Sequence, residues 1–224
     1  GANVVATGRR AERGAELEAE GSNLPGSIVF VQGDVKIADD VKRMVGTAID
    51  RFGSLDFAFN NAGGSTKSES AQGRLHLYEE EDWDDYSDMY LKSVWRCMKH
   101  EIEVMLPAGR GVIVNTSSIA GLVGIPNAAY TAAKHGVNGL TKSASQQYAG
   151  EGLRFIAICP GWIDTEMMAG AKENEALSTY LLDRSSVKRP GEASEIASLV
   201  KWLCSEGAAF VDGAIWPIDG GFTA

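Results

Sequence analysis

The chain has 224 residues, 44% of them hydrophobic and 23% charged, which is typical of a soluble globular protein. Its formal net charge of −9 argues against nucleic acid and anionic membranes as partners, because both require clustered positive charge. The lack of a long apolar run or signal peptide, together with three widely separated cysteines, predicts a cytoplasmic protein with reduced thiols and no membrane span.

Expected strands and helices alternate along the whole chain. Strands are predicted at Asn3–Thr7, which we expect to be buried, and at Ile28–Gln32, Leu55–Asn60, Gly111–Thr116, Arg154–Cys159 and Ala214–Pro217. Apolar residues at helical spacing predict helices from Asp39 or Asp40 as the cap to Gly53 as the stop, and over about 83–106 and 130–149. This alternation predicts a parallel sheet covered on both faces, in a single domain over residues 1–224.

Polar or glycine residues follow four of the expected strands. They are Gly33, Asp34 and Val35 after the second strand, "NNAGG" at 60–64, Ser117 and Ser118, and Pro160 with Gly161. Ligands of parallel α/β sheets bind at the carboxyl ends of the strands. Together these turns predict a binding cleft at one edge of the sheet.

No metal site is expected. The three histidines, at 76, 100 and 135, lack the spacing of metal ligands. The acidic run "EEEDWDD" at 79–85 fits the solvated first turn of a helix, where carboxylates are favoured by the helix dipole.

Tyr130 and Lys134 are four residues apart and therefore share one face of the predicted helix. An ammonium group beside a phenol favours the phenolate and lowers its pKa from about 10, which suits proton transfer near neutral pH. A serine hydroxyl at the adjacent strand end could bond a substrate oxygen. A Tyr and a Lys one turn apart are also common on ordinary amphipathic helices, so the spacing alone leaves both interpretations open.

Several motifs in sequence order resemble those of the short-chain dehydrogenase/reductase family. They are "GDV", "NNAG", "SSIAG" with "YTAAK", "CPGWIDT" and the C-terminal "KRPGEASEIASLVKWLCSEGAAFVDGAIWPIDGG". The resemblance covers nearly the whole chain. It implies a Rossmann-type doubly wound parallel sheet, a homodimer or homotetramer, and hydride transfer between a nicotinamide cofactor and a small-molecule secondary alcohol or ketone.

The resemblance also implies roles for individual residues. Tyr130 would be the general acid/base, Lys134 would lower its pKa and hold the nicotinamide ribose, and Ser118 would steady the substrate oxygen. The expected cofactor contacts are Arg9, Arg10, Asp34, Val35, Asn61, Ala62, Gly63, Tyr130, Lys134, Pro160, Gly161, Ile163 and Thr165. The segment 164–190 falls where the family has a substrate lid, and Trp162, Met167, Met168 and Tyr180 would give it an apolar lining for a hydrophobic substrate. The other interpretation is that these are ordinary packing residues.

The cofactor preference depends on the residues after the first strand. NAD-preferring members of the family usually have an acidic residue where this chain has Gly8, followed by Arg9 and Arg10. A guanidinium suits a 2′-phosphate, so NADP is favoured and NAD is the second choice. The other interpretation is that both arginines only open an exposed helix.

Three departures from the family pattern stand out. The first strand, the TGxxxGxG turn and the first helix of the family are expected to be missing before Asn3, Tyr90 stands at the position of a catalytic Asn, and Ile156 replaces an Asn that is usually structural. The alternative to an active enzyme is therefore a truncated chain that folds and oligomerises without cofactor or catalysis. For Tyr90 the alternative is a core aromatic residue.

Overall fold

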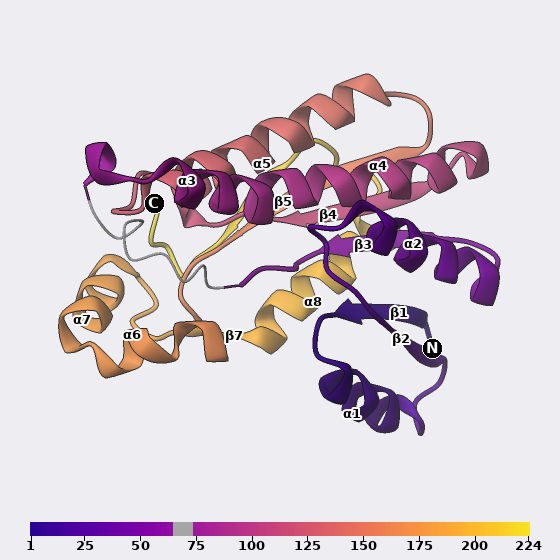
Figure 1. Cartoon of the computed structure of the whole chain (residues 1–224), viewed down its shortest axis with the longest axis horizontal. Coiled ribbons are helices and arrows are strands. Elements are labelled where there is room, and N and C mark those ends of the chain that lie inside the picture. The colour runs from indigo at the N-terminus through magenta and orange to yellow at the C-terminus, as the bar shows by residue number, and fades with distance from the viewer. Residues whose placement is uncertain (65–73) are drawn as a thin grey trace.

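The computed structural model describes residues 1–64 and 74–224, in which strands and helices alternate (Figure 1). The strands are β1 (Asn3–Gly8), β2 (Ser27–Gln32), β3 (Phe57–Asn60), β4 (Gly111–Thr116), β5 (Leu153–Pro160), β6 (Ile163–Asp164), β7 (Gly191–Glu192) and β8 (Ile215–Ile218). The α-helices are α1 (Ala11–Gly21), α2 (Ala38–Phe52), α3 (Glu80–Ser87), α4 (Ser93–Met105), α5 (Ala128–Gln147), α6 (Ala169–Glu173), α7 (Glu175–Arg184) and α8 (Ala193–Leu203). A π-helical turn covers Asp88–Lys92, and short 3-10 turns include Ile119–Gly121 and Glu166–Met168.

The strands pair in parallel, as predicted, but they form separate sheets. β1 pairs with β2, the order β3-β4-β5-β8 makes the larger sheet, and β6 pairs with β7 over two residues. The parallel α/β architecture is therefore confirmed. One continuous sheet is not seen in the described part of the chain, because no ladder joins β1 to β3.

β1 differs from the buried strand that the sequence predicts. Val4 is exposed and Val5 is only half-buried, since the strand pairs along one edge with β2 and belongs to a two-stranded ladder. The expected absence of a preceding βα unit is not confirmed. The first element of the structure is itself a strand, and it is paired in parallel with β2.

Helices cover both faces of the four-stranded sheet. α4 and α5 lie on one face, where Ile113 of β4 and Phe155 of β5 join their apolar side chains, and α8 lies on the other (Figure 1). Alternate residues of the same strands, Val114 and Ile156, pack toward α8. Ile156 is fully buried there and is a packing residue, as the sequence suggested. No helix in the described ranges combines the length and apolar character needed to cross a membrane.

The helix ends agree only in part with the sequence. Gly53 ends α2 with a φ of 80°, as predicted. The predicted caps Asp39 and Asp40 are wrong: Ile37 is the N-cap, and the Asp40 carboxylate instead accepts a hydrogen bond from the Asp34 amide at 2.8 Å. The helix predicted over 83–106 is divided into α3 and α4 by the π-helical turn.

Two glycines between α5 and β5 offer a matched test of this fold. Gly150 and Gly152 both have a φ of 80°, but a Cβ on Gly152 would lie 1.9 Å from the Gly109 carbonyl oxygen, whereas one on Gly150 would meet nothing within 4 Å. Gly150→Ala should cost about 1–2 kcal/mol of unfolding free energy for the left-handed backbone alone. Gly152→Ala should cost roughly a further 1–3 kcal/mol for the clash. Urea denaturation of both variants measures the difference, and equal losses would contradict the placement of Gly109.

Candidate active site

The carboxyl end of β4 and the start of α5 bring three predicted catalytic residues together. Ser118 follows β4 and caps the next 3-10 turn by accepting a hydrogen bond from the Ala120 amide at 3.1 Å. Asn127 caps α5 by accepting one from the Tyr130 amide at 2.9 Å, which fixes the first helical turn. The Tyr130 and Ser118 side chains are hydrogen-bonded to each other. The hydroxyl groups of a serine and a tyrosine therefore meet at one rim of the sheet.

The surroundings of Tyr130 change the expected acid–base behaviour. Burial raises the pKa of its phenol, and the hydrogen bond to Ser118 acts in the opposite direction. The pKa of Tyr130 is thus raised in the chain without ligands, and its lowering by Lys134 stays a prediction. The Lys134 ammonium lies 5.6 Å from the Tyr130 ring centre and donates to the Thr116 carbonyl oxygen at 2.7 Å.

Lys134 is buried, with 6% of its surface exposed. Desolvation lowers its pKa to about 8, because the low-dielectric interior disfavours the ammonium form. The carbonyl of Thr116 fixes the ammonium beside the tyrosine. A modest change of polarity at this site is therefore enough to change the charge of Lys134 near neutral pH.

Tyr90, at the expected position of the family Asn, lies against these residues. It belongs to the π-helical turn and to a cluster of buried residues that includes Tyr86 and Ala133. Its ring meets the Tyr130 ring edge to face, with ring centres 4.8 Å apart. Burial is the main cause that raises the pKa of its own phenol.

The turn after β3 forms an open edge next to this cluster. Asn61, Ala62 and Gly63 are exposed, so a ligand can reach the backbone, and the Asn61 side chain accepts a hydrogen bond from the Thr116 hydroxyl at 3.0 Å. The guanidinium of Arg9 lies 3.4 Å from the position of a Cβ on Gly64. Small exposed residues beside a guanidinium fit the predicted phosphate-bearing cofactor.

The other predicted cofactor residues near β1 and β2 are engaged with the chain itself. Arg9 forms an ion pair with Asp34 at 4.0 Å, and Asp34 also accepts a hydrogen bond from the Lys36 amide at 2.9 Å. The carbonyl of Val35 accepts a hydrogen bond from the Arg96 guanidinium at 2.8 Å. Arg10 forms an exposed ion pair with Glu166 at 3.5 Å. A ligand that binds Arg10 must therefore compete with a carboxylate.

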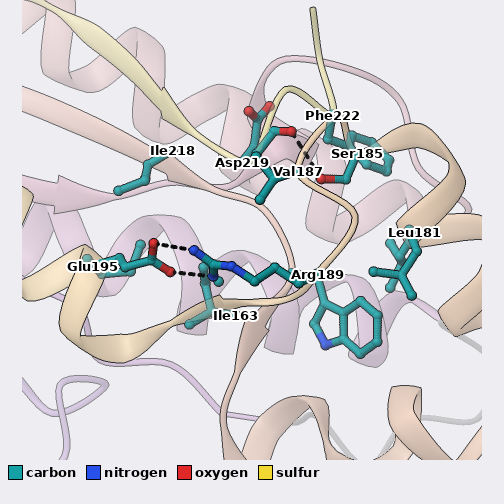
Figure 2. A pocket seen from close by; sticks show the side chains of 14 residues that line it. Ile163, Leu181, Ser185, Val187, Arg189, Glu195, Ile218, Asp219 and Phe222 are labelled. Carbon is teal, nitrogen blue, oxygen red and sulfur yellow. Dashed lines mark hydrogen bonds and ion pairs between the residues drawn. The ribbon is translucent and has the colours of Figure 1, made fainter.

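The predicted substrate residues fall in two places. Trp162 and Ile163, which follow Pro160 and Gly161 at the end of β5, line a cavity of about 140 Å³ with Leu181 and Phe222. Figure 2 shows Arg189 pointing to Glu195 at the same cavity, where their side chains pair at 2.8 Å. The Trp162 indole N–H is buried without a hydrogen-bond partner in the described residues.

Met167 lies elsewhere: it belongs to the 3-10 turn Glu166–Met168, and its side chain contacts the turn after β3. Its terminal methyl carbon is 3.7 Å from the position of a Cβ on Gly63. Met168 is half-buried in the same 3-10 turn, and the Thr165 hydroxyl before that turn lies 3.4 Å from the Ile163 carbonyl oxygen. Of the predicted lid residues, Met167 is thus the one placed beside the expected cofactor edge. No group of three or more His, Cys, Asp or Glu residues suited to a metal occurs in residues 1–64 and 74–224.

A buried polar network behind the open turn was not predicted from the sequence. The Asn60 side-chain amide donates to both Glu101 and Asn115 at 3.0 Å, and Asn115 donates to the Thr141 hydroxyl at 3.0 Å. Burial raises the pKa of Glu101 to about 7. A polar residue on the apolar side of a predicted amphipathic helix was the signal that could have revealed Glu101.

Glu101 should make the stability of the protein depend on pH. Its carboxyl binds a proton more tightly in the folded state, with a pKa of about 7, than in the unfolded chain, with about 4.5. The favourable contribution is therefore complete below about pH 4.5 and is lost as the pH rises to 7. The unfolding free energy of the wild type should therefore fall by about 3 kcal/mol between pH 4.5 and 8. We expect Glu101→Gln, which keeps an acceptor for Asn60, to abolish this fall.

Denaturant titrations of both proteins across this pH range measure the effect. An equal pH dependence in the wild type and in Glu101→Gln would show that Glu101 titrates normally and is not desolvated. The buried position of the carboxyl between α4 and β3 would then be incorrect.

Comparisons with known proteins agree with this geometry. Residues 1–223 match the family model described as enoyl-(acyl carrier protein) reductase. The chain is 42% identical to the A-factor type gamma-butyrolactone 1′-reductase of Streptomyces virginiae and 36% identical to the cyclohexanol dehydrogenase of Acinetobacter sp. (strain SE19), covering 100% of this chain and 86% of each relative.

A solved structure has the same architecture. The gluconate 5-dehydrogenase from Burkholderia cenocepacia J2315, in complex with NADP and tartrate, superposes with a TM-score of 0.90 at 27% identity. The match covers 100% of this chain and 86% of that one. The chain therefore belongs to the short-chain dehydrogenase/reductase family of oxidoreductases.

Proposed function

We propose that this oxidoreductase interconverts a secondary alcohol and a ketone, with Tyr130 as the general acid/base. The observation that carries the proposal is the meeting of Ser118, Tyr130 and Lys134 beside the turn 61–64, in which residues 61–63 are exposed. A bound nicotinamide would supply or accept the hydride. The activities of the relatives favour this proposal over the inactive, cofactor-free alternative.

Each of the three side chains has a separate task in the proposed reaction. The Tyr130 hydroxyl donates its proton to the carbonyl oxygen during reduction and takes it back during alcohol oxidation. The Ser118 hydroxyl, held by the 3-10 turn that it caps, hydrogen-bonds the same substrate oxygen. The Lys134 ammonium, fixed by the Thr116 carbonyl, stabilises the negative charge that Tyr130 carries after it has lost its proton.

A cyclic, largely apolar alcohol or ketone is the proposed substrate class. Support comes from the reductase and dehydrogenase relatives, whose names specify a gamma-butyrolactone and cyclohexanol. Met167, at the edge of the turn that holds Gly63, offers an apolar contact on the same side. Substrate binding at this edge would exclude water from the phenol and strengthen its hydrogen bonds.

NADP is the proposed cofactor, with NAD as the second choice. Arg9 and Arg10 are exposed at the carboxyl end of β1, where a 2′-phosphate could be bound through charge-assisted hydrogen bonds. The gluconate 5-dehydrogenase was solved with NADP, which supports the same choice. Asn61, Ala62, Gly63 and Lys134 would line the rest of the cofactor.

Tyr130→Phe tests the proposed acid/base. The variant keeps the ring in the cluster but has no hydroxyl to transfer a proton, so kcat should fall about 10²–10⁴-fold. The assay follows NADPH absorbance with a panel of cyclic ketones, and a calorimetric titration with NADPH should show binding close to that of the wild type. Turnover by Tyr130→Phe at the wild-type rate would refute the mechanism.

Arg9→Ala and Arg10→Ala test the cofactor preference. Loss of one charge-assisted hydrogen bond should weaken NADPH binding about tenfold and leave NADH binding nearly unchanged. Arg13→Ala is the matched control, because Arg13 is an exposed arginine of the same region that also pairs with Glu166. Titration calorimetry of each variant with both cofactors gives the ratio of the NADPH and NADH dissociation constants. An equal loss of affinity for NADPH and NADH would contradict recognition of the 2′-phosphate.

A further inference from the structure

Tyr90 contacts two parts of the site that are distant from it in the chain, helix α5 and the turn after β3. Its side chain is 7% exposed and projects from the π-helical turn between α3 and α4. It meets the Tyr130 ring, the Lys134 ammonium and the turn after β3.

The Tyr90 hydroxyl ties the turn to the helical layer. It donates a hydrogen bond to the Gly64 carbonyl oxygen. A Cβ on Gly63 would lie 3.5 Å from the Tyr90 ring, so the backbone of the turn packs directly on the phenol. Because Gly63 and Gly64 have no side chains of their own, this contact restrains a segment that would otherwise be free to adopt many conformations.

The Tyr90 ring acts on the catalytic pair. It stands edge to face against Tyr130, and the Lys134 ammonium lies 5.2 Å from its ring centre. An aromatic face near a cation stabilises the positive charge without adding a hydrogen bond. The ring also fills space beside Tyr130 that water would otherwise occupy, since both rings lie in one buried cluster.

We propose that Tyr90 is a positioning residue for the reaction: its hydroxyl holds the turn 61–64 in place for the cofactor, and its ring orients Tyr130 and shields Lys134. The inference rests on the proposed function and deepens it. The hydroxyl and the ring of Tyr90 have separate roles. A tyrosine that only fills the core would affect neither the turn nor the pH dependence of catalysis.

Two substitutions separate the two duties. Tyr90→Phe removes the hydroxyl and keeps the ring, whereas Tyr90→Leu removes both. Tyr148→Phe is the control, because Tyr148 is a half-buried tyrosine that packs on Phe155 near the other end of α5. Thermal melts of all three variants report whether each one folds.

The hydroxyl is tested by hydrogen exchange and by kinetics. In Tyr90→Phe the amides of residues 61–64 should exchange about tenfold faster without any ligand, and KM for NADPH should rise about five- to tenfold at a kcat within about twofold of the wild type. Tyr148→Phe should change neither quantity. Wild-type exchange and wild-type KM in Tyr90→Phe would overturn the proposal.

The ring is tested by the pH dependence of alcohol oxidation, in which Tyr130 must lose its proton. The titratable groups that act on Tyr90 are Asp85 and Tyr86 of α3 and Tyr130 of α5. Lys134 of α5 lies near the Tyr130 ring, and Cys159 of β5 acts on Lys134. Burial raises the pKa of Tyr130, so water admitted by Tyr90→Leu should lower it and move the rising limb of kcat about one pH unit downward. Tyr90→Phe should keep the wild-type profile, and an unchanged profile in Tyr90→Leu would overturn the role of the ring.

Failure of the proposed function has a different signature. A wild-type chain that binds neither NADPH nor NADH and turns over none of the ketones would refute the oxidoreductase mechanism. Hydrogen exchange in Tyr90→Phe would still decide whether Tyr90 holds the turn, because that measurement requires no cofactor or substrate.

Discussion

The site depends on the buried side chain of Asn115, next to the carboxyl end of β4. Asn115 is fully buried and lies opposite Asn60 in the β3–β4 ladder, where the two amides hydrogen-bond, and it also donates to Thr141 of α5. A slip of the register would leave these amides unpaired in an apolar layer, at a cost of about 1–3 kcal/mol for each polar group. The network therefore fixes the end of β3, and with it the turn 61–64, relative to the helix that bears Tyr130.

Burial in the same region shifts the pKa values of both members of the catalytic pair in the chain without ligands. Burial raises the pKa of Tyr130 and lowers that of Lys134 to about 8, so it favours the uncharged form of each residue. The chain alone does not hold a preformed phenolate. Its contribution is an arrangement in which the Thr116 carbonyl and the Tyr90 ring already surround the place where the ammonium must act. Preorganisation of this kind avoids rearrangement when charge develops.

The sequence predicted those features that depend on local spacing. β4 has the expected bounds, Gly53 ends α2, and Tyr130 and Lys134 share a face of α5 because a helix brings together residues four apart. It could not predict the exposure of β1, which depends on which strand pairs with it. The capping role expected of Asp40 failed for a similar reason, since its carboxylate bonds the amide of Asp34 in the preceding turn.

The π-helical turn explains why a continuous apolar pattern from Trp83 to Met105 was a poor guide to this helix. A straight helix would place that whole stripe on one buried face, yet Trp83 is 40% exposed whereas Tyr90 and Met105 are buried. One wide turn changes the direction in which the following side chains project, and such turns occur frequently at functional sites. Here it directs a large aromatic side chain at Tyr130 while α4 keeps its own apolar face on the sheet. The π-helical turn therefore contributes to the site through Tyr90, and α4 packs on the core.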